Sequence, residues 1–388
     1  MANSLRTFWQ RVSDGIQIQQ LWAQFRAEAR ASYELYSKEV DWTRLQGESG
    51  WKRLWRVIKG LFWAMMMKLS PGRRVLFLIA LVLLVLPDFD FSYGETEIQA
   101  HLNSAFMGGV ALLILLAFEL ADRVMMKRDL EIAREIQTWL MPAAPPQVPG
   151  VDIAFATRPA NTVAGDYYDA FFRPPAGVFE PQSLVPERDA RLLLVVADVA
   201  GKSVPAALLM ATLQASLRTL AALPTSLLEL VGGLNQYVCA QNLGGQRFTT
   251  AFLAELEPTT GRLTYVNAGQ NWPVLRRGSG AIDRLETGGL PLGIKPDARY
   301  ECGATILAAG DLLLIFSDGL IEAENQKEQE YGEPRMLGIA NSLFGGSAAD
   351  VLKQLMTSVD AFVGLARRHD DITCLVLRTT FASANAGV

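Results

Sequence analysis

Several aspartates stand at the ends of apolar runs, where a charge interrupts what otherwise reads as a buried strand. Asp198 and Asp318 end such runs, Asp370 and Asp371 stand at the start of one, and a fourth site, AGDYYDAFF, carries Asp166 and Asp169. For any one of them a turn is an equal interpretation, because aspartate beside glycine often forms turns. Together they indicate a cation site, since unpaired buried carboxylates repel one another and lose hydration. A shared divalent cation removes both effects, and oxygen-only ligands suit Mg²⁺ or Mn²⁺. A pair of such ions can activate water and hold a phosphoryl group for in-line attack.

The apolar runs that carry or accompany these aspartates are typical of β-strands. They read RLLLVVAD (191–198), TTAFLAELE (249–257), GRLTYVNAG (261–269), GDLLLIFSD (310–318) and DITCLVLR (371–378). Turn signals such as EPTTG and LAAGD separate several of them. Helical patterns interrupt them at 203–223 and at about 347–365. This segregated mixture predicts an α+β sandwich with the sheets inside.

The motifs occur in an order that resembles a known family. In sequence they are AGDYYD, ADVAGKSVPAALLM, TTAF followed by GRLTYVNAGQN, LPLGI, GDLLLIFSDGLIEAEN and DDIT. One such motif is a weak signal, but six in this order resemble the bacterial SpoIIE/RsbU-type branch of the metal-dependent PPM protein phosphatases. The resemblance covers about residues 128 to 378, because EIAREIQTWLMP also resembles the connector before these domains.

The resemblance implies a fold, a reaction and a set of ligands. It implies an α-β-β-α sandwich with two Mn²⁺ or Mg²⁺ ions at one edge of the sheets. It also implies hydrolysis of phosphoserine or phosphothreonine in a protein without a covalent phosphoenzyme. By position, Asp198 matches the aspartate that bridges both ions, while Asp166 and the Val199 backbone carbonyl match ligands of one ion. Asp318 and Asp370 match ligands of the other ion. The candidates for supporting roles behind the ligands are Asp169, Asp371 and Lys202.

Some positions depart from the family's commonest pattern. Ala164 replaces the first of two glycines before Asp166, and Ser203 stands in a turn that often takes glycine. Gln270 stands where histidine is usual, which puts in doubt any role of that histidine in shaping the substrate side. All the presumed ligands remain, so an active enzyme is expected.

Two residues are candidates for contact with the phosphate or the leaving group. Lys202 is close in sequence to Asp198, although an exposed, solvated lysine is the blander interpretation. His369 adjoins Asp370 and is a candidate to protonate the leaving group. Metal activation alone is the alternative, and it needs neither residue.

Two apolar runs, 75–86 and 105–118, predict a transmembrane hairpin. Each is shorter than the roughly 20 residues of a spanning helix, and we expect mildly polar flanks at 87–91 and 120–121 to extend them. Basic residues flank the pair and an acidic link joins it, so the positive-inside rule places both termini in the cytoplasm. The predicted location is the bacterial inner membrane, with the catalytic domain in the cytoplasm. The alternative is a pair of buried core helices.

Two further helices flank the hairpin. Residues 51–68 place Trp51, Trp55 and Ile58 on one stripe with basic residues mostly off it, which suits either an anionic membrane surface or docking on protein. Residues 121–150 predict a connector helix that ends at a proline-rich joint. Its apolar stripe is either a parallel homodimer seam or a face packed on its own domain.

Composition sets further limits. The chain has 388 residues, half of them apolar, and a net charge of −4, which gives no reason to expect nucleic-acid binding. Two histidines make a histidine-rich zinc site improbable, and three cysteines without a CxxC pair read as reduced thiols. The predicted divisions are 1–72, 73–122, 123–149, 150–378 and a tail at 379–388.

Three functions are considered for these sequence features. The leading one is a membrane-anchored phosphatase acting on a phosphorylated signalling protein, for which the resemblance suggests an anti-anti-sigma (STAS) regulator. The second is a catalytically silent relay that acts by binding partners, which the intact ligand aspartates argue against. The third is a two-metal nuclease. The sequence argues against it, because it lacks the basic, aromatic-lined groove expected for nucleic acid.

Overall fold

The computed structural model describes residues 50–87, 89–93, 98–177, 191–241, 247–343 and 345–380. Predictions for residues 1–49, and for most of the tail at 379–388, lie outside these ranges. The chain divides into two compact units, 1–125 and 126–388. The elements described in the first unit are α3 (Gly50–Lys68), α4 (Pro71–Val85), β1 (Phe89–Tyr93), β2 (Ile98–Leu102) and the beginning of α5 (Ser104–Leu140).

Helices α4 and α5 form a hairpin whose close approach depends on small residues. A Cβ on Gly108 of α5 would lie 2.9 Å from the Ala80 backbone oxygen of α4. The Ser104 hydroxyl donates to the Leu86 backbone oxygen at 2.6 Å, at the end where the helices are joined. At the other end the Arg73 guanidinium lies 2.6 Å from the Asp122 carboxylate. Small residues that let backbones approach are typical of membrane helix pairs.

The predicted extension of the first apolar run is wrong. Helix α4 ends at Val85, ahead of Pro87, and residues 89–93 instead pair antiparallel with 98–102 as strands β1 and β2. Proline cannot continue a helix, and a two-stranded ribbon satisfies the backbone groups of the link. The 15 residues of α4 extend about 22 Å at 1.5 Å per residue. Of the helices described before residue 126, only α5 is long and apolar enough to cross a membrane by itself.

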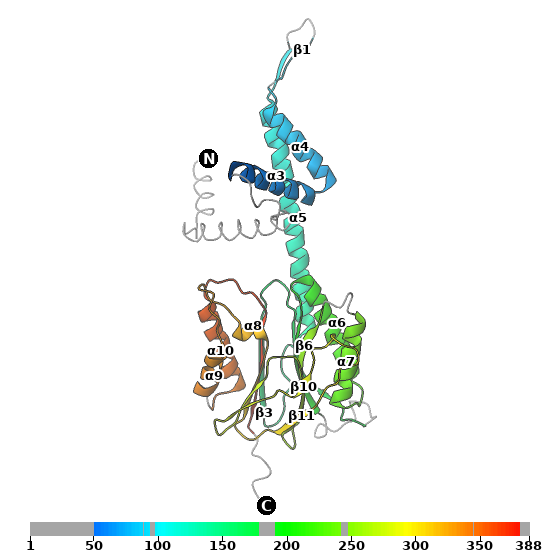
Figure 1. Ribbon diagram of the computed structural model, residues 1–388, viewed down its shortest axis with the longest axis vertical. Helices are drawn as coiled ribbons and strands as arrows, with labels where there is room; N and C mark the ends of the chain where they lie inside the picture. The colour runs from blue at the N-terminus through cyan, green and yellow to red at the C-terminus, as the bar shows by residue number, and fades with distance from the viewer. Residues whose placement is uncertain are drawn as a thin grey trace, which may run out of the picture. The chain divides into compact units, whose positions relative to one another are not determined.

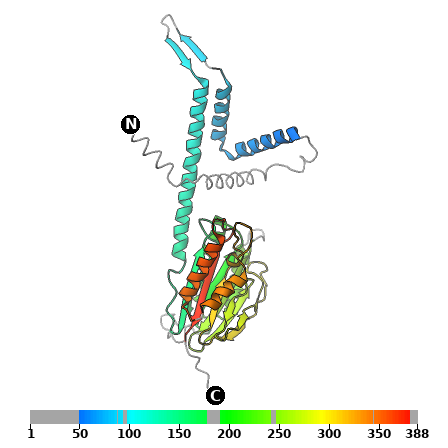
Figure 2. The ribbon, with the colours of Figure 1, turned by 90° about the vertical axis from the view of Figure 1, so that its left-hand side faces the viewer.

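The second unit is a four-layer sandwich (Figure 1). Two sheets lie face to face, one with strand order β10-β7-β6-β5-β4 plus β11 on β7, the other with order β3-β13-β12-β8-β9. Helices α6 and α7 cover the first sheet, while α9 and α10 cover the second (Figures 1 and 2). In chain order the elements are β3 (Val151–Arg158), β4 (Asp166–Arg173), β5 (Arg191–Val199), α6 (Val204–Ala221), α7 (Leu227–Gln241), β6 (Thr249–Glu257), β7 (Arg262–Ala268), β8 (Val274–Arg276), β9 (Ile282–Arg284), β10 (Gly288–Gly289), β11 (Gly303–Ile306), β12 (Leu312–Phe316), α8 (Asp318–Ile321), α9 (Glu333–Ser342), α10 (Ala348–Val363) and β13 (Ile372–Thr379).

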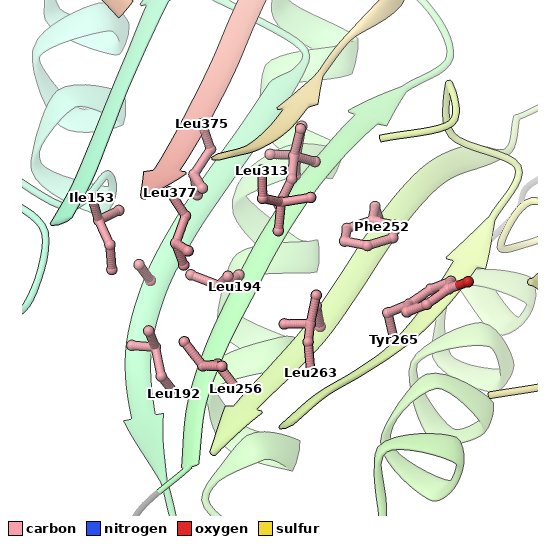
Figure 3. Close-up of a cluster of buried hydrophobic side chains, with 14 of the residues drawn as sticks. Ile153, Leu192, Leu194, Phe252, Leu256, Leu263, Tyr265, Leu313, Leu375 and Leu377 are labelled. Carbon is pink, nitrogen blue, oxygen red and sulfur yellow. The ribbon is translucent and has the colours of Figure 1, made fainter. Parts of the chain in front are cut away.

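Burial on both faces explains why the central strands read as continuous apolar runs. In β5, Leu192, Leu194 and Val196 belong to the core between the sheets. The alternate residues of β5 pack instead against the helix layer of α6 and α7. Figure 3 shows side chains of both sheets, among them Leu194 and Leu375, turned toward each other in the central core. A strand in the middle of such a sandwich has no polar face.

The sequence patterns found the principal strands and the helices at 203–223 and 347–365, but they missed α7 and α9. The signal for α7 was present. Ser226 accepts a hydrogen bond from the Glu229 backbone while its own N–H donates to the Glu229 carboxylate at 2.7 Å, which is a capping box. Leu227, Leu230 and Leu234 then recur at helical spacing and are buried.

Helix α5 is continuous from Ser104 to Leu140 and stops before the first proline of the joint. It therefore includes both the second apolar run and the predicted connector.

Candidate active site

The candidate active-site edge begins where the inner face of β5 changes from apolar to acidic. Side chains alternate along a strand, so Asp198 follows Leu194 and Val196 on the face between the sheets. The antiparallel register places Asp166 of β4 directly opposite Asp198. Thr250 of β6 is the register partner of Asp198 on its other side. Two carboxylates that are 32 positions apart in sequence thus become neighbours.

The second sheet brings Asp318 and Asp370 to the same edge. Asp318 opens α8 just after β12, and Asp370 precedes β13. A Cβ on Gly319 would lie 2.1 Å from the Asp371 backbone oxygen and 3.3 Å from the Asp370 Cβ. Only glycine fits that approach, so Gly319 allows the two segments that carry these aspartates to meet.

Burial and mutual repulsion perturb the carboxylates. Asp166 is 1% exposed, and its Oδ2 has no hydrogen-bond partner among the residues that the structure describes. Burial, followed by the charge of Asp198, raises the pKa of Asp166 well above its usual value. Burial, with smaller contributions from Asp318 and Asp370, raises the pKa of Asp198 to about 7. The pKa of Asp318 is raised by burial first and by Asp370 second.

The donor set fits a hard divalent cation. A buried carboxylate oxygen without a partner is costly, and a cation would both satisfy it and remove the repulsion among its neighbours. No three acidic, histidine or cysteine side chains in the described residues are already gathered around one point as a ligand set. The chain therefore supplies suitable donors, and a cation would have to complete their arrangement.

Asp371 supports the segment that leads to Asp166. Its carboxylate accepts hydrogen bonds from the backbone N–H groups of Ala160 at 2.7 Å and Gly165 at 2.6 Å. A Cβ on Gly165 would lie 3.2 Å from the Val199 backbone oxygen and 3.7 Å from Asp198 Oδ1. The carbonyl predicted as a ligand is thus next to the Asp166 segment, and Asp371 holds that segment against the second sheet.

Asp169 does not lie with the other aspartates at the edge between the sheets. It lies an odd number of positions from Asp166, so its side chain faces the helix layer instead of the inter-sheet core. There the Arg218 guanidinium of α6 donates to both of its carboxylate oxygens, each at 2.8 Å, and the Tyr167 hydroxyl also donates to it. Asp169 thus anchors α6 to β4.

The loop between β5 and α6 combines strain with a positive charge. Ser203 has φ 63° and ψ −147°, a region that is almost confined to glycine. The Lys202 ammonium lies 3.2 Å from the Asp370 carboxylate and donates to the His369 backbone oxygen at 2.6 Å. The His369 ring is largely exposed and lies 3.5 Å from the Glu324 carboxylate. Lys202, His369 and Asp370 line one polar cleft of about 600 Å³ beside the carboxylates.

Sequence reasoning missed one contact of the connector. Gln137 of α5 is buried, and its amide exchanges two hydrogen bonds with the Ala164 backbone, at 2.8 and 2.9 Å. Ala164 is two residues before Asp166. A polar residue in the register of an apolar stripe was the signal, because a buried amide needs specific partners.

Solved structures with this architecture define the class of fold. The SiaA-PP2C domain of Pseudomonas aeruginosa superimposes with a TM-score of 0.56, covering 66% of this chain and 98% of that chain at 18% identity. The RsbU and RsbW domains of Rv1364c from Mycobacterium tuberculosis match with a TM-score of 0.50 and 25% identity, over 62% of this chain and 63% of that chain. The second unit therefore has the PP2C-type fold of the metal-dependent protein phosphatases.

Sequence comparisons identify the branch. Residues 188–380 match the family model of stage II sporulation protein E (SpoIIE). Phosphoserine phosphatase RsbU of Bacillus subtilis (strain 168) is 29% identical over 255 residues, which cover 65% of this chain and 70% of RsbU. Protein IcfG of Synechocystis is 24% identical over 292 residues, which cover 68% of this chain and 43% of IcfG. The C-terminal unit belongs to the SpoIIE/RsbU-type serine/threonine phosphatases of the PPM family. The family, the sandwich fold and the hydrolase class predicted from the sequence are thereby confirmed.

Proposed function

We propose that this protein is a membrane-anchored bacterial phosphatase that hydrolyses phosphoserine or phosphothreonine on a signalling protein. The observation that carries the proposal is the buried, unpartnered Asp166 Oδ2 opposite Asp198, at a sheet edge beside a polar cleft. The name of the relative RsbU, a phosphoserine phosphatase, supports the substrate class. We extend the proposal to a STAS-type regulator as the phosphoprotein.

The same residues would hold two Mn²⁺ or Mg²⁺ ions. Asp198 would bridge both, Asp166 and the Val199 carbonyl would bind one, and Asp318 and Asp370 the other. When bound, the ions acidify water and neutralise charge on the phosphoryl oxygens. In the overall reaction the water oxygen forms a bond to phosphorus as the bond from phosphorus to the serine oxygen breaks.

The chain's own residues position these groups and hold the substrate. Asp371 fixes the loop before Asp166 by accepting two backbone N–H groups. Lys202 presents its ammonium group at the cleft beside Asp370, where it would attract a phosphate oxygen. His369 in the same cleft is our candidate to return a proton to the serine oxygen.

Membrane anchoring rests on the first unit. Large apolar side chains of α5, among them Phe106, Leu113 and Leu116, are more than half exposed. Such a surface is expected of a helix that faces lipid. Trp51, Trp55 and Ile58 on α3 are also at least half exposed, which favours α3 lying in the membrane interface.

The connector offers a surface for a second copy of the chain. Ile132, Ile136 and Trp139 of α5 form an exposed apolar stripe, whereas Gln137 faces the domain. We propose that two connectors pair along this stripe.

The test of function is Asp198→Asn in the full chain. Its amide is a far weaker ligand where two dications meet, so turnover of a serine-phosphorylated STAS protein should fall by orders of magnitude. The wild type should also melt at a higher temperature with added Mn²⁺, and the variant much less, because binding to the native state stabilises it. Near wild-type turnover together with an unchanged Mn²⁺-dependent rise in melting temperature would refute the two-metal assignment.

A further inference from the structure

Gln270 makes an unusual set of contacts for a loop residue. It follows β7, is 4% exposed, and uses both functional atoms of its side chain. Its Oε1 accepts from the Thr250 hydroxyl at 2.6 Å, and its Nε2 donates to the Phe316 backbone oxygen at 3.0 Å. Its backbone N–H donates to the Asn267 side chain at 2.7 Å.

The two side-chain partners lie on different sheets and next to different ligands. Thr250 in β6 is the register partner of Asp198. Phe316 is the last residue of β12, two positions before Asp318. One amide thus links the strand beside Asp198 to the strand that delivers Asp318. Asp371 makes the corresponding link between the second sheet and the Asp166 segment through the Gly165 N–H.

The backbone beneath Gln270 is itself held firmly. Gly269 has φ +78°, and a Cβ there would lie 2.5 Å from Pro291 Cγ. Gly269 also forms a bridge with Ala251 of β6. Neither the backbone nor the side-chain amide of Gln270 is free to move. Gln270 therefore holds its two partner strands at a fixed separation.

We propose that Gln270 is a positioning residue that fixes the separation between the Asp198 and Asp318 halves of the carboxylate cluster. The inference rests on the proposed function, because the Gln270 amide can position ligands only if these carboxylates bind cations. Like charges gathered at the open end of a sandwich push its sheets apart, and a neutral link resists this without adding charge.

The chemistry of the link predicts which substitutions preserve it. It requires one donor toward Phe316 and one acceptor toward Thr250. Neutral histidine offers both, whereas ionised glutamate offers only acceptors and would face a carbonyl oxygen. The histidine usual in this family and Gln270 in this chain can therefore both supply one donor and one acceptor.

The test compares Gln270→Met, Gln270→Glu and Gln270→His in the full chain in detergent. The readouts are Mn²⁺ binding by calorimetry, followed by kcat and KM with a serine-phosphorylated protein. We expect Gln270→Met and Gln270→Glu to bind Mn²⁺ roughly tenfold more weakly, the effect of losing one or two buried hydrogen bonds. Their kcat should fall while KM for the phosphoprotein stays the same. Gln270→His at pH 8 should recover both quantities to within about threefold of wild type.

Tyr331→Phe is the matched control. It removes a hydrogen bond of 2.9 Å from the buried Tyr331 to Ser358, in the core that the second sheet forms with α9 and α10. It should lower the melting temperature without changing Mn²⁺ affinity. If Gln270→Met does not fold, Thr250→Val removes the hydrogen bond between Thr250 and Gln270 from the other side. It should weaken Mn²⁺ binding, while Thr250→Ser, which keeps the hydroxyl, should not.

Wild-type Mn²⁺ affinity in Gln270→Met, an equal loss in Tyr331→Phe, or failure of histidine to rescue would each overturn the inference. The proposed function fails separately. A wild-type chain that binds Mn²⁺ but releases no phosphate would refute the function, while weaker Mn²⁺ binding by Gln270→Met in that chain would still support the positioning role.

Discussion

At the residue scale, the candidate active-site edge contains residues that lower the stability of the fold when no ligand is bound. Asp166 is buried, and one of its oxygens has no partner in the described part of the chain. Ser203 adopts a backbone conformation almost confined to glycine. Both features destabilise the fold by themselves. Each therefore gives a prediction that can be measured independently of turnover.

The metal-free protein should lose stability as pH rises from about 4 to 7. The folded pKa of Asp198 is raised to about 7, mainly by burial. Within this window the folded state keeps a proton that the unfolded state has released, so stability falls with pH, by on the order of 4 kcal/mol. Asp166, Asp318 and Asp371 have pKa values raised in the same direction.

The measurement is a thermal melt in EDTA between pH 5 and pH 8, on wild type and Asp198→Asn. The variant should show a shallower slope. Added Mn²⁺ should make the wild type more stable at the higher pH, because its ligands must be deprotonated. A wild-type stability that rises with pH in EDTA would contradict the raised pKa values.

Ser203→Gly should stabilise the fold. Glycine adopts φ 63° without a Cβ penalty, and relief of the strain should outweigh its greater unfolded entropy by about 1 kcal/mol. Ser203→Ala is the control, because it keeps the Cβ and the Ser203 hydroxyl makes no cap bond. Equal melting temperatures for the glycine and alanine variants would mean that the backbone is not strained there.

At the element scale, α5 joins the second apolar run to the active-site edge. Its last turns carry Gln137, whose amide is bonded to Ala164, and the Asp371 carboxylate holds the neighbouring Gly165. A rotation of the end of α5 would therefore act on the segment that presents Asp166. Such a movement can regulate activity only if two arrangements differ in free energy by an amount that a signal can supply.

Alanine insertions after Arg134 test this coupling. One or two alanines rotate Gln137 by about 100° or 200°, whereas four return it to within about 40° of its face. Turnover should change more with one or two than with four. The same phosphate-release assay, with helix content followed by circular dichroism, supplies the readout. Equal effects from all three insertions would remove the coupling.

At the scale of the whole molecule, we propose that the first unit anchors the phosphatase to a membrane. The α4–α5 hairpin carries Arg73 and Asp122 at one end and the β1–β2 ribbon at the other. Basic residues at the open end of the hairpin favour the cytoplasmic side. The ribbon would then lie outside the cytoplasm.

Topology reporters check this orientation. A fusion at Glu97, which lies outside the described residues, should read as external, while fusions at Met1 and Val388 should read as internal. The controls are fusions that carry the same reporter after the Arg73–Arg74 pair has been replaced by glutamines, which should weaken the preference. An internal signal at Glu97 in the wild type would defeat the hairpin model.

The amino-acid sequence by itself determined the strands, the acidic edge and the family. The strands and their aspartates are local features, because an apolar run and an aspartate at its end are visible without knowledge of any partner. The family follows from the order of the motifs along the chain. The tertiary structure decided which aspartates act together. It paired Asp166 with Asp198 and turned Asp169 toward Arg218, because register and strand face depend on what the sheet packs against. It also gave Gln270 its partners, 20 and 46 positions away in sequence, since hydrogen bonds between sheets exist only once both sheets have packed.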